Sequence, residues 1–145
     1  MQRPWPKKTS ESVLGVDTNV LVRFLTDDDD LQTPQAHSLV TKAANHPICV
    51  SMLVLAETYN VLTKVKKQPV QAVLESFRLL LHSPAMRVER PDMVSAAIED
   101  AAETKAGFSD ALIAMQNKEA RCMTTATFDI RATRLPDMSA AKDFV

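Results

Sequence analysis

Short apolar runs alternate along this chain with longer segments whose apolar residues recur at helical spacing. The run Val13–Val16 stops at Asp17, and the apolar residues of Thr18–Leu25 then fall on one side of a helix. Read in the same way, the whole chain predicts strands over 13–16, 48–50, 86–89, 121–124 and 143–145. It predicts helices over 18–25, 33–45, 52–65, 70–83, 91–105 and 110–120, with a short helix over 129–134. Strands that alternate with helices in this way indicate an α/β fold, with a parallel sheet covered by helices on both faces.

Polar residues and prolines mark where the predicted helices begin. Thr33, followed by Pro34, is predicted to cap the second helix. Ser51 and Ser109 are predicted to cap the third and the sixth. Residues 1–12 carry prolines and lysines and little that packs, so we expect a mobile N-terminal tail. Residues 13–145 show no boundary and are predicted to form a single domain.

Four carboxylates interrupt sequence that is otherwise apolar, namely Asp17, Glu57, Asp110 and Asp129. Asp17 and Asp129 follow predicted strands, and Asp110 lies just inside a helix start. These three also have structural interpretations, as a helix cap, a turn residue and a partner of the helix dipole. Glu57 lies more than a turn into an apolar helix, where a carboxylate that faces the core needs a partner.

The carboxyl ends of parallel strands form one edge of the sheet, and ligands collect outside that edge. The predicted topology therefore allows all four acids to converge on one cleft. Four carboxylates held together repel one another unless cations are present. Oxygen ligands suit hard ions such as Mg²⁺ or Mn²⁺, which activate water and stabilise charge on a transferring phosphate.

These segments resemble the PIN domain family, and within it the VapC-type toxin ribonucleases of bacterial toxin–antitoxin pairs. VDTNVLVRFLTDDD, LAETYNVL, FSDALIAM and TFD occur in the family's order and with family-like spacing, from about Val13 to the C-terminus. The resemblance implies a three-layer α/β/α sandwich with a mostly parallel sheet of four or five strands. It also implies a metal-dependent endoribonuclease that uses Mg²⁺ or Mn²⁺, forms a homodimer and is inhibited by a cognate antitoxin.

The resemblance assigns the family's catalytic and metal-binding acids to Asp17, Glu57, Asp110 and Asp129. Thr18 and Asn19 match the turn that supports the first aspartate, and Thr127 matches a hydroxyl position close to the last acid. Gly107 stands where many relatives carry a further acid, so this chain departs from the family there.

Several basic residues are candidates for contacts to RNA phosphates, which position a substrate without reading its bases. The candidates are Arg23, Lys64, Lys66, Lys67, Arg131 and Arg134. A solvated helix end explains the lysines equally well, and Arg23 can instead pair with an acid. The run Asp27–Asp30 lacks the glycine and glutamate of a calcium-binding loop and is expected to be a solvated connection. His37, His46 and His82 lack ligand spacing and are expected at the surface or at helix ends.

Composition excludes several other classes of protein. The 145 residues include only two glycines, too few for a dinucleotide fingerprint or a P-loop. The net charge of −1 means that any nucleic-acid-binding surface must be local. Cys49 and Cys122, each in an apolar run, are expected to be buried thiols of a cytoplasmic protein. No signal peptide is visible, and no apolar run is long enough to cross a membrane.

Two other functions stay compatible with the residues. One is a catalytically weak PIN-like module that binds RNA or a protein partner. The other is an aspartyl-phosphate domain with Asp17 as nucleophile, but the phosphatase pattern requires a second acid where Asn19 stands. The four acids favour the nuclease.

Overall fold

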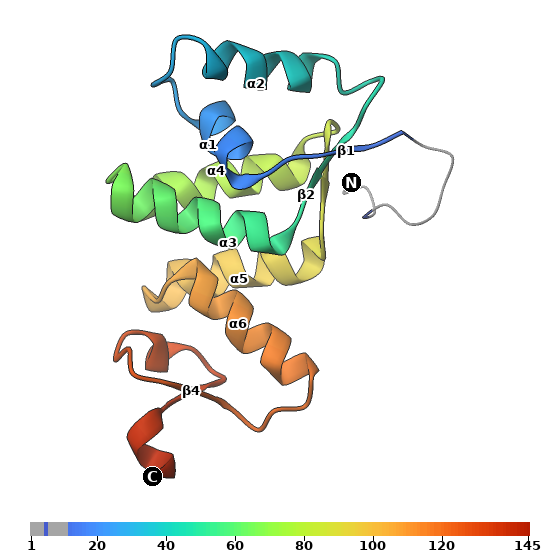
Figure 1. Cartoon of the computed structure of the whole chain (residues 1–145). Helices are drawn as coiled ribbons and strands as arrows, with labels where there is room; N and C mark the ends of the chain where they lie inside the picture. The colour runs from blue at the N-terminus through green and yellow to red at the C-terminus, as the bar shows by residue number, and fades with distance from the viewer. Residues whose placement is uncertain (1–4, 6–11) are drawn as a thin grey trace. The chain divides into compact units, whose positions relative to one another are not determined.

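The computed structural model describes residue 5 and residues 12–145 of the chain. These residues form two compact units, Met1–Pro91 and Asp92–Val145, which we call the N-terminal unit and the C-terminal unit (Figure 1). Residues 1–4 and 6–11 lie outside the described residues, and with them most of the predicted tail. That tail and the single domain over 13–145 therefore stay predictions.

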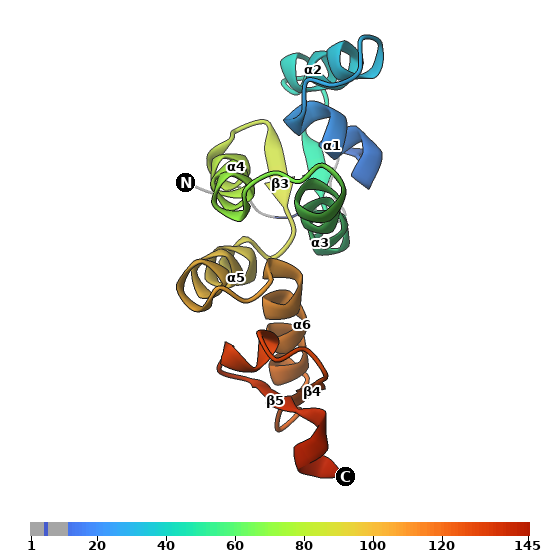
Figure 2. The same ribbon diagram turned by 90° about the vertical axis from the view of Figure 1, so that its left-hand side faces the viewer.

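The N-terminal unit is built on a parallel sheet with strand order β1-β2-β3. The strands are β1 (Leu14–Gly15), β2 (Ile48–Val50) and β3 (Met86–Val88). The helices are α1 (Thr18–Leu25), α2 (Gln32–Thr41), α3 (Met52–Asn60) and α4 (Val70–His82), and a π-helical segment, Val61–Val65, continues α3. Helix α1 packs against α2 and α3, and α4 packs against β3. Figure 2 shows β3 between α4 and α3, with helices on either side of the strand.

The core of the N-terminal unit is formed by apolar residues of its helices and of β2 and β3. Residues Val73, Leu74 and Phe77 of α4 are at most 1% exposed, because their helical spacing places them on one side. Leu79, on the other side of α4, is 65% exposed. Each large apolar side chain buried in this way contributes about 1.5–3 kcal/mol relative to exposure. The core therefore holds α4 in place.

The C-terminal unit begins with two helices, α5 (Pro91–Thr104) and α6 (Phe108–Glu119). They are followed by β4 (Thr125–Thr127) and β5 (Met138–Ala140), which pair in parallel, and by two 3-10 segments, Ala132–Arg134 and Ala141–Phe144. Phe108 is fully buried, whereas Met123, Phe128 and Ile130 are 85%, 96% and 84% exposed. This unit thus presents several large apolar side chains to solvent.

The α/β class predicted from the sequence is confirmed, since every strand pair is parallel and helices separate the strands along the chain. The five strands form a three-stranded sheet and a two-stranded sheet, one in each unit. Helix α1 and strand β2 have the predicted bounds. The predicted helix over 52–65 is α-helical only to Asn60 and π-helical beyond it.

The last two predicted strands are wrong in position. Arg121 takes a left-handed φ of 68°, and the N–H groups of Arg121 and Cys122 donate to the carbonyls of Lys118 and Asn117. This Schellman motif ends α6, and β4 therefore begins only at Thr125. The partner of β4 is Met138–Ala140, and residues 143–144 of the strand predicted over 143–145 instead lie in a 3-10 turn.

One of the three predicted helix caps is confirmed. Ser51 Oγ accepts a hydrogen bond from the Val54 N–H at 3.1 Å. Thr33 does not cap α2, because the helix begins one residue earlier and Asp29 Oδ1 accepts from the Leu31 and Gln32 N–H groups. Ser109 lies inside the first turn of α6, since that helix begins at Phe108.

The two cysteines are less buried than expected. Cys49 is partly buried and Cys122 is exposed, because Cys122 follows the turn that ends α6 rather than lying in a strand. Both cysteines are among the described residues, and no disulfide joins them. All three histidines are exposed, as predicted. In the part of the chain that the structure describes, we find no helix with the length and apolar character needed to traverse a bilayer.

Candidate functional site

Asp17 is the N-cap residue of α1. Its Oδ1 accepts a hydrogen bond from the Val20 N–H at 3.1 Å, which confirms the structural interpretation of this acid. Such a cap contributes about 1 kcal/mol to helix stability. The side chain is exposed, and its Oδ2 accepts no hydrogen bond from the described residues. One oxygen therefore fixes the carboxylate and the other is available to a ligand.

Glu57 is joined to the start of α1 by a hydrogen bond. Its Oε2 accepts from the Thr18 hydroxyl at 2.7 Å, and Thr18 directly follows Asp17. Glu57 is exposed, so it does not face the core, and its partner is the Thr18 hydroxyl. The reason is that α3 buries Leu55, Thr58 and Tyr59 on other parts of its surface. Thr18 thus connects the two acids of the N-terminal unit through the packing of α1 on α3.

The donor set of these two acids fits part of a site for a hard cation. Asp17 Oδ2 and Glu57 Oε1 are carboxylate oxygens that no described residue engages. Mg²⁺ commonly binds through one or two carboxylates together with water and substrate phosphates. No group of three or more His, Cys, Asp or Glu side chains within the described ranges is placed to hold a metal. The pair alone therefore supplies two carboxylates, fewer ligands than a complete metal site needs.

The C-terminal unit carries the other two acids. Asp110 is half-buried in the first turn of α6, where the helix dipole favours a negative charge. Asp129 follows β4 and is exposed, and its Oδ1 accepts from the Arg131 N–H at 2.9 Å. The Thr127 hydroxyl accepts from the Asp129 N–H at 3.0 Å. Thr127 therefore lies where the resemblance predicts a hydroxyl close to the last acid, and together these bonds form a local turn.

The predicted site residues divide between the two units. Asp17, Thr18, Asn19 and Glu57 lie in the N-terminal unit, and Asp110, Thr127 and Asp129 lie in the C-terminal unit. Within the first unit, Thr18 brings the acids of α1 and α3 together. Asn19 is exposed in the first turn of α1 and makes no hydrogen bond to the described residues. The joint site of all four acids stays a prediction.

Two of the candidate RNA-binding cations are engaged in ion pairs. Arg23 Nη1 lies 3.2 Å from Asp28 Oδ1, and Arg23 Nε lies 3.9 Å from Asp29 Oδ2. Lys66 Nζ lies 2.6 Å from Asp28 Oδ2. The hydrogen bond from Lys66 is the largest cause that lowers the pKa of Asp28 to about 2, and the Thr26 hydroxyl adds to it. Arg23 therefore pairs with acids, as the sequence allowed.

The acidic run Asp27–Asp30 is correspondingly more than a solvated connection. Backbone N–H groups of Gln32 and Leu31 lower the pKa of Asp29 by hydrogen bonding to its carboxylate. Asp28 joins α1 to the end of the π-helical segment through Arg23 and Lys66. These acids anchor the loop between α1 and α2, which the charge run by itself did not reveal.

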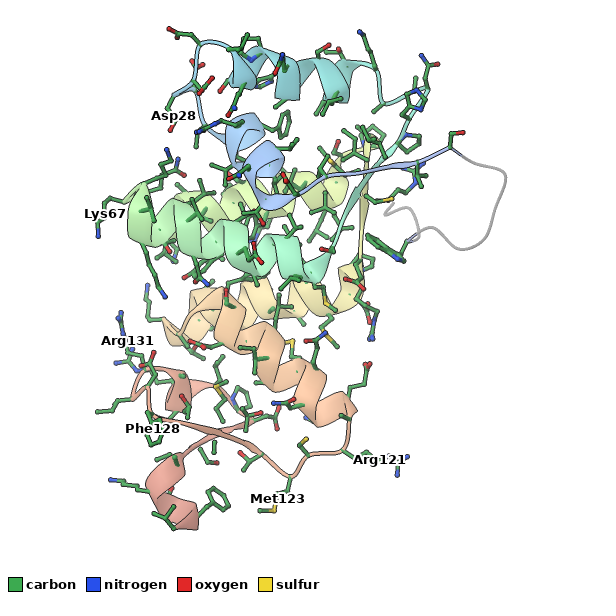
Figure 3. The ribbon with its side chains drawn as sticks, viewed as in Figure 1. Asp28, Lys67, Arg121, Met123, Phe128 and Arg131 are labelled. Atoms are coloured by element: carbon green, nitrogen blue, oxygen red, sulfur yellow. The ribbon has the colours of Figure 1, made fainter. Side chains whose placement is uncertain are left out.

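Three of the other candidate cations are available to a ligand. Lys64, Lys67 and Arg131 are exposed, and their side chains make no hydrogen bond or ion pair with the described residues. Lys67 extends into solvent from the end of the π-helical segment, and Arg131 projects from the loop that also presents Phe128 (Figure 3). Arg134 Nη1 donates to the Thr104 carbonyl at 3.4 Å.

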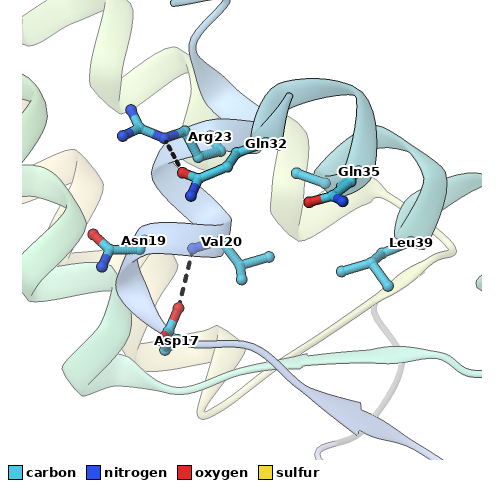
Figure 4. A pocket seen from close by; sticks show the side chains of 8 residues that line it. Asp17, Asn19, Val20, Arg23, Gln32, Gln35 and Leu39 are labelled. Atoms are coloured by element: carbon cyan, nitrogen blue, oxygen red, sulfur yellow. Dashed lines mark hydrogen bonds between the residues drawn. The ribbon is translucent and has the colours of Figure 1, made fainter. Parts of the chain in front are cut away.

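A pocket of about 310 Å³ lies between α1 and α2 and reaches Asp17 (Figure 4). Its polar lining residues are Asp17, Asn19, Arg23, Gln32 and Gln35. The sequence alone does not point to the two glutamines, because nothing in α2 suggests chemistry until α2 is placed against α1. The one available signal was their spacing of three, which puts both on one side of a helix.

Comparison with known proteins defines the class of protein. The model of the PIN domain family matches residues 15–138, so the chain belongs to this family. Among solved structures it is similar to VapC20 of Mycobacterium tuberculosis, a sarcin-ricin loop cleaving toxin, with 20% sequence identity and a TM-score of 0.40. That similarity covers 86% of this chain and 97% of the other. No curated protein matches the chain.

Proposed function

We propose that this protein is a metal-dependent endoribonuclease that hydrolyses RNA phosphodiester bonds, and that it is the toxin of a toxin–antitoxin pair. One observation carries the proposal: the family match over residues 15–138 includes Asp17, Glu57, Asp110 and Asp129. The assignment to a toxin rests on the likeness of its motifs to VapC-type sequences. We further propose a cytoplasmic homodimer that a cognate antitoxin inhibits.

In this proposal the four acids act together on one substrate phosphate. Asp17, Glu57 and Asp110 hold Mg²⁺ or Mn²⁺, and Asp129 holds a second ion or orients water. A bound divalent ion supplies charge stabilisation at the phosphate and activation of water. The protein's part is to keep the carboxylates in position before substrate arrives. The Val20 N–H orients Asp17 and the Thr18 hydroxyl orients Glu57, which supports such preorganisation.

The distribution of charge supports a division of roles among the basic residues. Lys64, Lys67, Arg131 and Arg134 contact the phosphates of the RNA in this proposal. Arg23 and Lys66 have a structural role instead, because Asp28 and Asp29 already neutralise them. Phosphate contacts of this kind hold the substrate in register but do not select its sequence.

Thermal unfolding in EDTA and then in Mn²⁺ or Mg²⁺ tests the metal site. At 100 times its dissociation constant, the ion should stabilise the wild type by about 2.7 kcal/mol. Asp17→Asn and Asp110→Asn should lose this gain. Asp27→Asn is the matched control, since Asp27 is an exposed acid without a hydrogen bond to the described residues, and it should respond like the wild type.

Cleavage of RNA under the same conditions tests the activity. The wild type should cleave only with the divalent ion, and the two site variants should not cleave. A wild type that neither responds to metal nor cleaves RNA contradicts the nuclease and favours the catalytically weak binding module. Unchanged cleavage by Asp110→Asn contradicts the assignment of that residue.

A further inference from the structure

The pocket between α1 and α2 combines an apolar floor with amide groups. Val20 of α1 and Ala36 and Leu39 of α2 form the floor. Gln32 and Gln35 line the pocket from α2, on the side that faces α1 (Figure 4). Its volume of about 310 Å³ lies at the lower end of the range for small-molecule sites. An apolar floor with polar groups at the rim suits a planar ligand that makes hydrogen bonds along its edge.

The hydrogen bonds around Gln32 determine which groups it offers to a ligand. Its Oε1 accepts from Arg23 Nε at 2.8 Å. A guanidinium can only donate, so the amide must present its oxygen to Arg23 and keep its NH₂ group for other partners. Gln32 therefore presents hydrogen-bond donors. Gln35 is exposed and has no hydrogen bond to the described residues, so it offers both a donor and an acceptor.

The charges around the pocket select against an anionic ligand. Arg23 is the one cation among the described residues that lines it, and Asp28 and Asp29 already pair with its guanidinium. Asp17 adds a negative charge at the other end. A phosphate would thus meet a carboxylate and a neutralised cation, whereas a neutral heterocycle meets amides and apolar carbons. The chemistry favours a nucleobase over a phosphate.

We propose that this pocket receives the nucleobase of an RNA nucleotide that adjoins the cleaved phosphodiester, and that Gln32 and Gln35 read its edge. The inference rests on the proposed function, because it takes Asp17 as part of the site where the phosphate is cleaved. Asp17 lines the pocket, so a base bound there lies beside that acid. A base with a carbonyl or ring-nitrogen acceptor matches the donors of Gln32. The pocket then makes cleavage depend on sequence, which phosphate contacts alone do not.

The test varies one base at a time in short RNA oligonucleotides, at each position flanking the cleaved bond. We expect the wild type to prefer one base at one position by about tenfold or more, the discrimination typical of paired hydrogen bonds to a base. Gln35→Ala should lose that preference and keep the preferences at other positions. Gln71→Ala is the matched control, because Gln71 is an exposed helical glutamine of α4 without a hydrogen bond to the described residues.

Fluorescence anisotropy of the same oligonucleotides in EDTA separates binding from cleavage. Base-selective binding that Gln35→Ala abolishes and Gln71→Ala retains supports the pocket, even in a protein that cleaves no RNA. Cleavage by the wild type with the same base preference in Gln35→Ala and Gln32→Ala overturns the pocket and leaves the nuclease standing. A wild type that neither cleaves nor selectively binds any of the oligonucleotides overturns both.

Discussion

Glu57 of the N-terminal unit and Asp129 of the C-terminal unit are positioned by different kinds of hydrogen bond. In the N-terminal unit, Thr18 donates to Glu57 across 39 residues of sequence, so this link exists only while α1 packs against α3. In the C-terminal unit, the bonds that position Asp129 come from Thr127 and Arg131, two residues away on either side. The first arrangement depends on tertiary packing and the second on local backbone. Disturbing the packing should therefore affect the acids of the two units differently.

Two phenylalanines, one from each unit, differ in their burial. Phe77 of the N-terminal unit is 1% exposed, whereas Phe128 of the C-terminal unit is 96% exposed. The first contributes to a core, and the second lies beside Asp129 and contributes almost nothing to burial. The same residue type thus stabilises the fold at position 77 and not at position 128. The four predictions that follow compare residues of the N-terminal unit with residues of the C-terminal unit or with controls.

The largest expected effect concerns whether the two units serve one site. Asp17→Asn and Asp129→Asn should each reduce RNA cleavage by about a thousandfold, since a metal supplies several kcal/mol of transition-state stabilisation. In the double variant, the loss should be no greater than in a single variant, because residues that act as a unit are not additive. Single-turnover cleavage rates measure this. If the losses of the two single variants multiply in the double variant, the two acids have separate functions. Asp143→Asn is the control, because Asp143 is an exposed acid outside the site, and this variant should cleave RNA at the wild-type rate.

The next effect concerns stability. Phe77→Ala should lower the free energy of unfolding by about 3–5 kcal/mol, because it removes a fully buried aromatic side chain and leaves a cavity. Phe128→Ala should change it by no more than about 0.5 kcal/mol. Urea unfolding followed by circular dichroism measures both. A comparable loss in Phe128→Ala would show that Phe128 is buried in the folded protein in solution.

A smaller effect is expected at the link between the two acids of the N-terminal unit. Thr18→Val removes the hydroxyl that orients Glu57 and should reduce cleavage by about 10–100-fold, the usual range for groups that orient metal ligands. Thr41→Val is the control, since its hydroxyl donates only to the Ser38 carbonyl within α2. The apparent affinity for Mn²⁺ should fall with the Thr18 variant and not with the control. An unchanged Mn²⁺ affinity would remove Thr18 from the site.

The smallest effects concern pH, and they have opposite signs in the two units. The pKa of Asp28 is lowered to about 2, chiefly by Lys66, so its contribution to stability is present above pH 3.8 and is lost as the pH falls toward 2. The pKa of Asp100 is raised, first by burial and then by Glu103 and Asp137, so its ionisation lowers stability as the pH rises above 3.8.

Unfolding of two variants between pH 2 and pH 7 separates these signs. Asp28→Asn should be less stable than the wild type near neutral pH, with the difference vanishing as the pH approaches 2. Asp100→Asn should be more stable than the wild type near neutral pH and equal to it below pH 3.8. If both variants were more stable than the wild type near neutral pH, or both less stable, the opposite signs predicted for Asp28 and Asp100 would be wrong.

Local patterns were sufficient to predict much of the fold. The bounds of α1 and β2 and the Ser51 cap were predicted correctly, because each depends on residues within one or two turns of chain. The caps at Thr33 and Ser109 were predicted wrongly because both helices begin earlier. Asp29 Oδ1 accepts from the Gln32 N–H at the start of α2, and Gly107 is the N-cap residue of α6. The position of β4 was missed because a left-handed Arg121 takes part in the turn that ends α6, so the strand begins only at Thr125.

The sequence by itself determined the α/β class and the family, and it marked the four acids as candidates, since periodicity and motif spacing are properties of the chain alone. It also determined that Asp17 caps a helix, because that hydrogen bond spans only three residues. Tertiary structure decided that Thr18 meets Glu57, that Lys66 neutralises Asp28 and that α2 adds two glutamines to a pocket at Asp17. These contacts join residues that are far apart in sequence or on different helices, and only the packing of α1 against α2 and α3 makes them neighbours.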